Sequence, residues 1–504
     1  MNVSFTDSLQ NVKQRGGKNL KVSILGAAKQ VPGSMSLYEA GGLKILVDCG
    51  MEQTNDVRTD MIKNIKQFPF NPRELDYVVV THAHIDHCGL IPYLVKCGYR
   101  GPILSTIPTL DICAISLVDC AFIWQREIQK ALKSIEVKKK TIKLNNGMLK
   151  CPYSIEEAEL AMNYFRGYDF GKEIRLNDNV DLIFRHAGHI MGAASLEFHV
   201  KKNEYEEEIV LFTGDISGKK DIHPFVEPVE YIKKADYVIC ESTYGNKKHN
   251  KSVSPEKFLL DKIQKYCIEH GKTILIATFS VQRTQEVIYY LNRIYNANKD
   301  NQRLQKIPIY VDSPMSINVT KNVYETSPDF YGNDTGLSKE EMQDILRWDR
   351  ITYTETPAQS QSLANGNPKI ILSSAGMMSS GRIVNHIESF LPVKNACVLL
   401  SGYCAPETFG GRLQQAVAAG KTKITSVMGH ELNIRADVDK IEGLSGHSDM
   451  NSTINYLRNI KGVKKVILNH GEVDAIEQLK DEIRKQLRLN VVVPNLNQTI
   501  KLQK

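Results

Sequence analysis

The sequence contains ten cysteines but no two of them spaced as CxxC. Several, such as Cys49, Cys240 and Cys397, lie in or beside apolar runs of the kind that form buried strands. This usage is typical of a reducing compartment and argues against a disulfide framework. We therefore expect a protein whose cysteines serve packing.

Segments that would direct the chain to a membrane are also lacking. Residues 1–26 have no long apolar core of the signal-peptide kind, and no stretch approaches the roughly 18 apolar residues of a membrane span. We expect a cytoplasmic protein with no membrane partner. Internal repeats and low-complexity tracts are absent too. The lysine-rich run from Lys130 to Lys143 comes closest, and we interpret it as a solvated helix face rather than a phosphate-binding surface.

What the sequence does have is enough apolar chain for two or three domains. It contains 504 residues, of which 42% are hydrophobic and 24% are charged, so globular units with real cores are expected. The net charge of +7 is small for this length. It is compatible with an anionic partner and equally with an ordinary soluble protein.

Short apolar runs, most of which end in a polar or glycine-containing turn, recur along the chain. Outside the central region they are residues 44–50, 77–84, 180–189, 208–215, 237–245 and 464–472. Buried strands have this pattern. The polar residues that could perform chemistry gather at the C-terminal ends of these runs, where α/β sheets and sandwiches place their loops and sites.

Between about residues 246 and 430 the pattern changes to alternating strands and helices. The strands are predicted at residues 273–280, 307–314, 369–376 and 396–403. Such alternation predicts a parallel, doubly wound α/β unit. Because candidate ligands occur both before and after it, we interpret 246–430 as a domain inserted between two parts of another domain, 1–245 and 431–504.

The stretch THAHIDHCG, residues 81–89, concentrates three histidines and one aspartate. His82 and His84 are two residues apart, so at the end of an extended strand both side chains point the same way and can share one cation. Asp86 and His87 fall at the start of a predicted helix and can face a second cation. Imidazole and carboxylate donors without a thiolate suit Zn²⁺ and leave a position open for water, as in catalytic zinc sites.

Further ligand candidates follow later strands. They are His189, Asp215 and His470. In the order Asp48, HxHxDH, His, Asp and a late His, this set resembles the metallo-β-lactamase superfamily, whose αββα sandwich holds two zinc ions at one sheet edge. The resemblance implies one zinc on His82, His84, His189 and Asp215, and a second on Asp86, His87, Asp215 and His470. Asp48 would orient the ligand loop, since a ligating imidazole needs a partner for its other nitrogen.

Six ordered motifs sharpen the match to the β-CASP branch of that superfamily, which consists of nucleases. They are ESTYG (241–245), ATFSVQRTQE (277–286), DSPMS (312–316), SSAGMMSSGR (373–382), SGHSD (445–449) and LNHGE (468–472). The resemblance implies an αββα metallo-β-lactamase sandwich with an inserted doubly wound α/β (β-CASP) domain. Relatives usually have a glycine where this chain has Gln282, which leaves the local backbone geometry there open.

The same resemblance implies a zinc-dependent ribonuclease with two Zn²⁺ per chain and RNA as its partner. His447 is then the general acid, held charged and oriented by Glu241, and Asp48 and Asp86 complete the catalytic set. We also expect phosphate contacts near the start of a helix. The residues expected to bind substrate are Ser373, Ser374, Ser379, Ser380 and Arg283.

Other functions remain open at this point. A DNA-processing nuclease of the superfamily often has an apolar residue at the third histidine, so His470 favours RNA. A non-catalytic scaffold would have lost ligands, and none is missing. A small-molecule hydrolase would not need the insert. We expect endonucleolytic cleavage of single-stranded RNA, with 5′-exonuclease action as the alternative. The sequence leaves the oligomeric state open, a homo-oligomer included.

Overall fold

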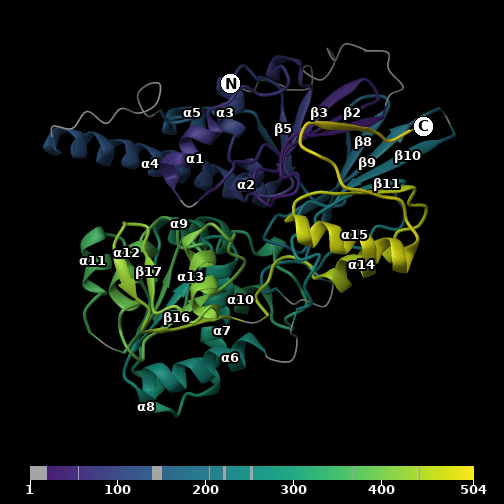
Figure 1. Ribbon diagram of the computed structural model, residues 1–504. Helices are drawn as coiled ribbons and strands as arrows, with labels where there is room; N and C mark the ends of the chain where they lie inside the picture. Colours follow the sequence, from purple (N-terminus) through teal and green to yellow (C-terminus); the bar gives the residue numbers. More distant parts are fainter. Residues whose placement is uncertain are drawn as a thin grey trace, which may run out of the picture.

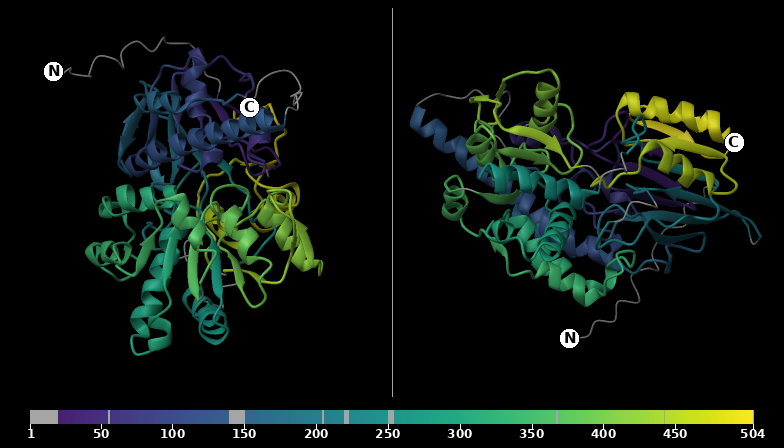
Figure 2. Two further views of the ribbon diagram at one scale, coloured as in Figure 1. Left: turned by 90° about the vertical axis from the view of Figure 1, so that its left-hand side faces the viewer. Right: turned by 90° about the horizontal axis from the view of Figure 1, so that it is seen from below.

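The computed structural model describes residues 20–54, 56–138, 150–203, 205–218, 223–249, 254–366, 368–441 and 443–503. Two sheets packed face to face form one unit, and a unit with a single large sheet lies beside it (Figures 1 and 2). The lysine-rich run predicted at 130–143 lies partly outside the described residues. Its described part, up to Lys138, is the end of helix α4.

The first sheet of the sandwich combines both ends of the described chain. Its outermost strand comes from residues near the C-terminus and pairs with the first strand of the chain, antiparallel, with Lys21 opposite Lys501. From edge to edge its strands are β22 (Gln498–Lys501), β1 (Lys21–Ile24), β2 (Ser36–Ala40), β3 (Leu43–Val47), β4 (Tyr77–Val79), β5 (Ile103–Thr106) and β6 (Phe165–Tyr168).

The second sheet has the same number of strands and contains most of the expected apolar runs. Strand β11 lies between β10 and β20 and is parallel to both, so the carboxyl ends of these three strands meet at one edge. In order the strands are β21 (Val491–Val492), β20 (Lys465–Leu468), β11 (Tyr237–Cys240), β10 (Glu207–Phe212), β9 (Ala194–Lys201), β8 (Val180–His186) and β7 (Glu173–Arg175).

Alternate residues of both sheets fill the space between them. Tyr38 of the first sheet packs against Phe198 and Phe212 of the second, with ring centroids 5.1 and 5.4 Å apart. The intervening residues face outward and are covered by helices, for example Val78 and Val238. The covering helices are α1 (Val57–Asn64), α2 (Ile85–Cys88), α3 (Ile91–Lys96), α4 (Ile107–Lys138), α5 (Ile155–Met162), α14 (Met450–Arg458) and α15 (Val473–Leu487), with the 3₁₀ turn η1 (Pro72–Glu74). This is the expected αββα sandwich.

The inserted domain is built on one sheet in which all neighbouring strands are parallel. Its order is β14 (Ile351–Tyr353), β13 (Ile309–Asp312), β15 (Lys369–Ser373), β12 (Thr273–Ala277), β16 (Cys397–Leu400) and β19 (Asp437–Lys440). A small hairpin, β17 (Lys423–Thr425) with β18 (Glu431–Asn433), accompanies it. Because β19 pairs with β16, the sheet continues past residue 430, the boundary expected from the sequence.

Helices cover both faces of this sheet, as a doubly wound unit requires. Ile274 and Ile276 of β12 face one buried cluster, whereas Leu275 and Ala277 face another. The helices are α6 (Pro255–Lys262), η2 (Ile263–Glu269), α7 (Arg283–Ala297), α8 (Gln302–Gln305), α9 (Pro314–Val319), η3 (Thr320–Tyr324), η4 (Pro328–Phe330), α10 (Lys339–Leu346), α11 (Pro357–Ser362), α12 (Ile383–Phe390) and α13 (Phe409–Ala418).

Helix α4 corrects one expectation from the sequence. By length and composition its segment Ile107–Gln129 could cross a membrane, although no such stretch was expected. Half of this segment is buried inside the protein, where Leu117 and Trp124 belong to the core. The helix also contacts α9 and η3 of the inserted domain, over which it extends in Figure 1. Part of its apolar surface is therefore used in packing within the sandwich and against the inserted domain.

A second contact between the domains comes from residues 223–226, which follow β10. Phe225 inserts its ring among Tyr289, Tyr324 and Tyr331, with centroids 6.2, 5.9 and 5.2 Å away. The ring is fully buried. We call this contact the Phe225 anchor. It ties the loop that begins at the end of β10 to the inserted domain.

Gln282 lies beside the anchor in the left-handed region, with φ of 69°. Glycine adopts this conformation more easily, so the glycine that the family resemblance implies here would suit this backbone. Here the side chain compensates: its amide donates to the Pro224 carbonyl at 2.8 Å and to Glu286 at 2.9 Å, and it accepts from Tyr324 at 2.7 Å. The glutamine thus stabilises the turn from β12 into α7.

Candidate metal centre

The candidate ligands meet at one edge of the sandwich because each follows the carboxyl end of a strand. The segment with His82 and His84 follows β4, and His189 follows β8. Asp215 and His470 follow β10 and β20. Helix α2 begins at Ile85, so Asp86 and His87 lie in its first turn, as expected. The seven residues predicted as metal ligands are thereby brought together.

Four of them form a first group, His82, His84, His189 and Asp215, whose donor atoms all lie within 4.8 Å of one another. Nδ1 of His84 is 3.0 Å from Nε2 of both His82 and His189. Oδ2 of Asp215 is 3.4 Å from Nε2 of His82 and 3.5 Å from Nε2 of His189. The atoms enclose a single point that one cation could occupy.

Asp86, His87 and His470 form a second group with the same spacing. Nε2 of His87 is 3.1 Å from Nε2 of His470, which is 3.5 Å from Oδ2 of Asp86. Asp215 joins the groups, because its Oδ2 is also 3.4 Å from His87 Nε2 and its Oδ1 is 3.5 Å from His470 Nδ1. The carboxylate of Asp215 therefore faces both groups of ligand atoms.

The chemistry of these groups fits bound cations. Oδ1 of Asp215 is buried and has no hydrogen-bond partner among the described residues, an arrangement that costs free energy unless a cation or donor faces it. Burial lowers the pKa of His84 to about 4 and holds those of His82 and His189 well below the usual value, so these rings are neutral and can offer a lone pair.

The second group lies in a field that favours positive charge. Burial opposes the ionised form of Asp86, but a hydrogen bond from His470 and the charge of His87 bring its pKa to about 2. Burial likewise opposes a charged His87, yet the carboxylates of Asp215 and Asp48 raise its pKa. A cation between these residues would be stabilised by the same carboxylates.

Asp48 lies behind the ligands, where the sequence predicted an orienting residue. Its Oδ2 accepts from Nδ1 of His87 at 2.7 Å, which directs Nε2 of that ring toward the other ligands. Its Oδ1 accepts from the backbone N–H of Thr81 at 2.8 Å and from the Thr81 hydroxyl at 3.0 Å. The carboxylate thereby holds the start of the ligand segment as well as one ring.

Three residues near the ligands were not predicted from the sequence. Besides Thr81, they are Gly446, whose carbonyl accepts from Nδ1 of His189 at 2.8 Å, and Thr243, whose hydroxyl is 3.2 Å from Nδ1 of His470. A side chain at Gly446 would meet His189 Nδ1 at 2.8 Å. The sequence gives only a weak indication of these three residues. Each lies next to, or two positions from, a predicted site residue, but only the fold shows which side chain it contacts.

His447 and Glu241 form the expected pair beside the metal ligands. Nδ1 of His447 is 3.0 Å from Oε2 of Glu241, whose Oε1 accepts from the Ile216 N–H at 2.7 Å. Burial acts against the charged ring, but the carboxylates of Glu241 and Asp215 raise the pKa of His447. Its side chain is 15% exposed, against 0–5% for most of the ligands around it, so this ring is more accessible than most of theirs.

At the residues expected to bind substrate the structure differs from the sequence-based expectation, and their contact with substrate stays a prediction. The serines were expected to begin a helix, but α12 starts only at Ile383. Ser373 ends β15, fully buried, with its hydroxyl donating to the Asp312 carbonyl, and Ser374 is buried against Ser316. Ser379 and Ser380, in the loop before α12, are half-buried and stay predictions.

Arg283 was expected to contact substrate, but its guanidinium is buried and paired with Glu286. A Cβ placed on Gly446 would lie 2.5 Å from Nη2 of Arg283. The side chain therefore packs behind the His189 and Gly446 contact and supports the metal centre from the inserted domain.

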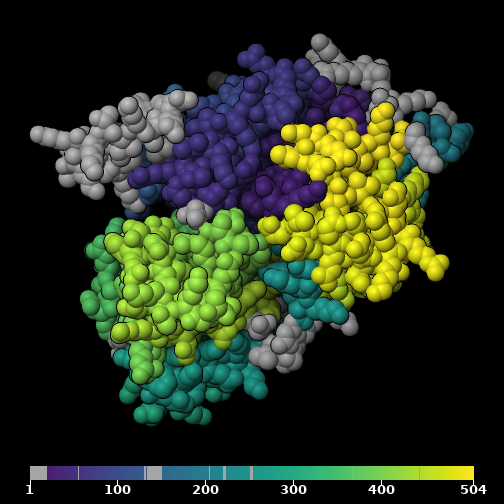
Figure 3. All heavy atoms as spheres, in the orientation of Figure 1, coloured from purple at the N-terminus to yellow at the C-terminus, as the bar shows by residue number. Residues whose placement is uncertain are grey.

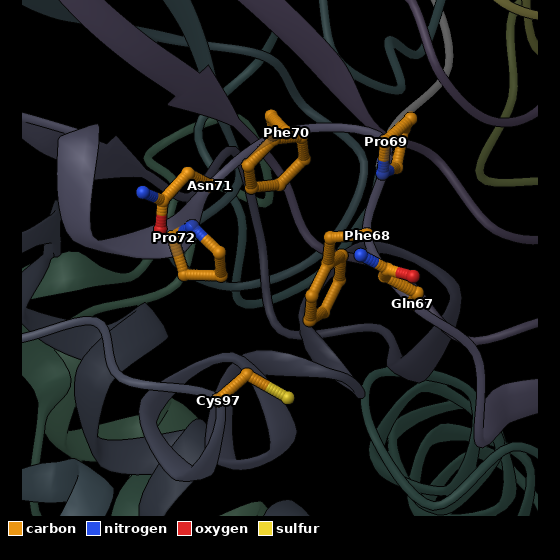
Figure 4. A pocket seen from close by; sticks show the side chains of 7 residues that line it. All are labelled: Gln67, Phe68, Pro69, Phe70, Asn71, Pro72 and Cys97. Carbon is orange, nitrogen blue, oxygen red and sulfur yellow. The ribbon is translucent and has the colours of Figure 1, made fainter.

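A surface hollow elsewhere on the sandwich shares no residue with this centre. It encloses about 720 Å³ and is lined by Gln67, Phe68, Pro69, Phe70, Asn71, Pro72 and Cys97 (Figure 4). Phe68 and Phe70 stack with centroids 5.3 Å apart, and the Cys97 thiol is exposed. The residues that line the hollow include no group of metal ligands and no pair of acid and base. The candidate catalytic groups therefore lie at the metal centre and not in this hollow.

Comparison with known families agrees with this architecture. The metallo-beta-lactamase superfamily model matches residues 28–96, which contain the first ligands. The Beta-Casp domain model matches 284–413 within the inserted unit. The model of the Zn-dependent metallo-hydrolase RNA specificity domain matches 431–494, which include His447 and His470.

Curated relatives match over nearly the whole chain. Ribonuclease TTHA0252 of Thermus thermophilus is 29% identical over 461 residues, 91% of this chain and 94% of the relative. Transcription termination factor FttA of Methanocaldococcus jannaschii is 28% identical and covers 96% of this chain and 72% of its own. Integrator complex subunit 11 of Danio rerio is 26% identical, with 95% and 74% covered.

A solved structure shares the fold at low sequence identity. It is a crystal structure of a protein of unknown function from Enterococcus faecalis V583, with a TM-score of 0.50, 11% identity, and 96% of this chain and 100% of that chain covered. The three family models match segments of the sandwich and of the inserted unit, and the curated relatives match over 91–96% of this chain. The chain belongs to the β-CASP family of the metallo-β-lactamase superfamily.

Proposed function

We propose that this protein is a metal-dependent ribonuclease that hydrolyses RNA phosphodiester bonds with two zinc ions per chain. The observation that carries the proposal is Asp215, a buried carboxylate that faces both groups of ligands and has one oxygen without a hydrogen-bond partner among the described residues. Relatives whose names include a ribonuclease and a transcription termination factor support RNA as the substrate.

The donor set favours zinc over harder cations. It consists of five imidazoles and two carboxylates, and oxygen-only sites are the preference of magnesium and calcium. When bound, the two ions would activate a water molecule and offset the negative charge of the phosphoryl group. The chain itself supplies the orientation: Asp48 and the Gly446 carbonyl fix two of the rings, and Asp215 spans both groups.

His447 completes the reaction by protonating the leaving oxygen. Hydrolysis of a phosphodiester releases an alcohol, which needs a proton as the bond to phosphorus breaks. The Glu241 carboxylate, 3.0 Å from Nδ1, keeps the ring protonated and leaves Nε2 as the donating atom. Because Glu241 is anchored by the Ile216 N–H, its position does not depend on the substrate.

We expect endonucleolytic cleavage of single-stranded RNA. A 5′-labelled RNA incubated with the zinc-loaded protein should yield labelled fragments of several lengths from the earliest times. Labelled mononucleotides alone would indicate a 5′-exonuclease, and cleavage of single-stranded DNA at the same rate would contradict the preference for RNA.

Metal analysis tests the two-zinc proposal separately. Protein purified without chelator should contain about two zinc ions per chain, because seven donors exceed the four that one tetrahedral site uses. One ion per chain, or consistent recovery of another metal, would contradict the bridged pair while leaving a metal-dependent reaction intact.

A further inference from the structure

Two lysines flank the ring of Tyr244, next to the proposed general acid. Nζ of Lys247 is 5.4 Å from the ring centroid and Nζ of Lys440 is 5.5 Å from it, and Lys440 also contacts the Tyr244 hydroxyl at 3.4 Å. The same ring lies 6.0 Å from the imidazole of His447, centroid to centroid. Two ammonium groups are thus held one aromatic ring away from the reaction centre.

Neither ammonium group has a carboxylate partner in the part of the chain that the structure describes, whereas lysines elsewhere often pair with one, for example Lys262 with Asp439. Burial lowers the pKa of Lys247, and the charge of Lys440 lowers it further. Keeping two like charges close without a counter-charge costs free energy. Such an arrangement is typical of a surface that an anion completes.

The position of the lysines is set by the two crossings between domains. Lys247 lies where the chain leaves β11 of the sandwich for the inserted domain, and Lys440 is the last residue of β19, just before the chain returns. Both lysines therefore belong to the two crossings that join the sandwich and the inserted domain. Figure 3 shows the inserted domain, in green, against the returning part of the sandwich, in yellow. A strand of RNA that reached the metal centre between the two domains would pass these crossings.

A third group from the inserted domain faces the same ring. The rings of Tyr403 and Tyr244 are 6.0 Å apart, edge to face. The Tyr403 hydroxyl is buried and has no hydrogen-bond partner among the described residues. A hydroxyl donor without an acceptor, on a ring that packs against the tyrosine between the two lysines, could add the hydrogen bond that a phosphate oxygen would accept.

We infer that Lys247, Lys440 and Tyr403 form a binding site for the phosphate that neighbours the scissile phosphate, on the side of the leaving group. The side follows from His447, which gives its proton to the leaving oxygen and lies against Tyr244. The inference rests on the proposed function, because it places the site on the RNA strand. Residues from both the inserted domain and the chain segment that leaves the sandwich form the site. Because it binds the phosphate and not a base, its recognition of RNA is independent of base sequence.

Charge-neutralising variants test the site. Lys247→Gln, Lys440→Gln and the double variant should raise KM for a single-stranded RNA, by roughly threefold to tenfold each, and change kcat less than twofold. The slope of log kcat/KM against log salt should become shallower by about 0.7 in the double variant, the contribution of one phosphate on a single strand. Lys299→Gln, just after the end of α7, removes the same charge away from Tyr244 and should match wild type.

A modified substrate identifies the phosphate. An RNA with one uncharged methylphosphonate next to the cleavage site, on the leaving side, should lose as much kcat/KM with wild type as normal RNA loses with the double variant, and the two losses should not add. Additive losses, or variants that behave like Lys299→Gln, would overturn the site while cleavage by wild type upholds the proposed function. If wild type cleaves no RNA, both proposals fail.

Inhibition by inorganic phosphate shows whether the lysines bind a phosphate of the RNA strand or a free phosphate ion. As a competitive inhibitor it should bind wild type and the double variant with constants within about threefold of each other, because the strand supplies most of the phosphate's positioning. Inhibition that weakens tenfold or more in the double variant would assign the lysines to free phosphate and overturn their role on RNA. Zinc content equal to wild type in every variant shows that the centre itself is unchanged.

Discussion

Two residues of the metal centre have backbone conformations that residues other than glycine rarely adopt. Asp48 and His470 have φ of 58° and 54°, in the left-handed region that favours glycine. Each such residue costs on the order of 1 kcal/mol or more and persists only where its surroundings fix it. Here the strained backbone aims a carboxylate and an imidazole at the same cluster. Both side chains point where a regular strand end would not place them.

The contact of Asp48 with His87 leads to a first prediction. Asp48→Asn keeps the size but removes the charge that holds Nδ1–H of His87, so the ring loses its fixed orientation. Zinc affinity should fall roughly 10- to 100-fold, the usual effect of removing a partner of a ligating histidine. Competition with a zinc chelator measures it. Ser34→Ala, which removes only a 3.3 Å contact to the same carboxylate, should leave the affinity within about threefold.

His447 and Asp86 should fail in different ways when replaced. His447→Ala should retain both zinc ions and bind RNA while kcat falls about 10²- to 10⁴-fold, the usual contribution of a general acid. Asp86→Ala should lower zinc content and activity together. Measuring metal content and turnover on the same preparations separates the two roles.

A substrate with a better leaving group adds a second readout for this pair. It needs less protonation and should recover much of the rate lost in His447→Ala, but none of the rate lost in Asp86→Ala. If His447→Ala releases zinc instead, the ring is a ligand, and the assignments of His447 and His470 must be exchanged.

At the residue scale the sequence predicted the candidate ligands well, but it did not predict most of the groups that orient them. His82, His84 and Asp86 lie within five positions, so local spacing already suggests a shared site. The carbonyl of Gly446 cannot be predicted this way, because any residue has a carbonyl and only tertiary structure brings it to His189, 257 positions away. Donors with a distinctive side chain leave a signal in sequence; backbone donors and acceptors leave none.

At the scale of elements, strands were more predictable than the turns between them. Runs such as 273–280 and 369–376 contain the observed β12 and β15, because a strand buried on both faces must be apolar throughout. The helix expected at the serines of 373–382 begins later, at Ile383. Serine and glycine favour both helix starts and open loops, so composition alone could not decide.

The Phe225 anchor allows a prediction about one element. Phe225→Ala removes a fully buried ring from a cage of three tyrosines and should destabilise the protein by about 3–5 kcal/mol. Denaturant unfolding, followed by tyrosine fluorescence and circular dichroism, measures the loss. Because the anchor joins two domains, we expect the inserted domain to unfold at lower denaturant than the sandwich.

Phe122→Ala is the matched control for the anchor. This ring lies on α4 and is 48% exposed, so its removal should change stability by no more than about 0.5 kcal/mol. Two variants of equal stability would show that the tyrosine cage closes over the vacated space, and that the anchor contributes little to joining the domains.

The whole molecule shows why its two domains depend on each other. Arg283 of the inserted domain packs against Gly446, and residues 223–226 of the sandwich enter the inserted domain. The order of motifs in the sequence indicated an insertion but could not show these contacts. Arg283 and Gly446, for example, are separated by more than a hundred residues. Domain organisation follows from the alternation of motifs, whereas the interface follows from packing.

Because the metal ligands come from strand ends in both sheets, metal removal should destabilise the sandwich as a whole. A ligand that binds only the folded state adds RT ln(1 + [L]/Kd), about 2.7 kcal/mol when its free concentration is 100 times Kd. Removing zinc with a chelator should therefore lower the midpoint of thermal unfolding, and added zinc should restore it. The same treatment of Asp86→Ala should produce a smaller shift, because that variant has lost part of the second group. An equal shift in wild type and variant would mean that the stabilising cation occupies the first group alone, held by His82, His84, His189 and Asp215, and that Asp86 contributes to chemistry without contributing to the fold.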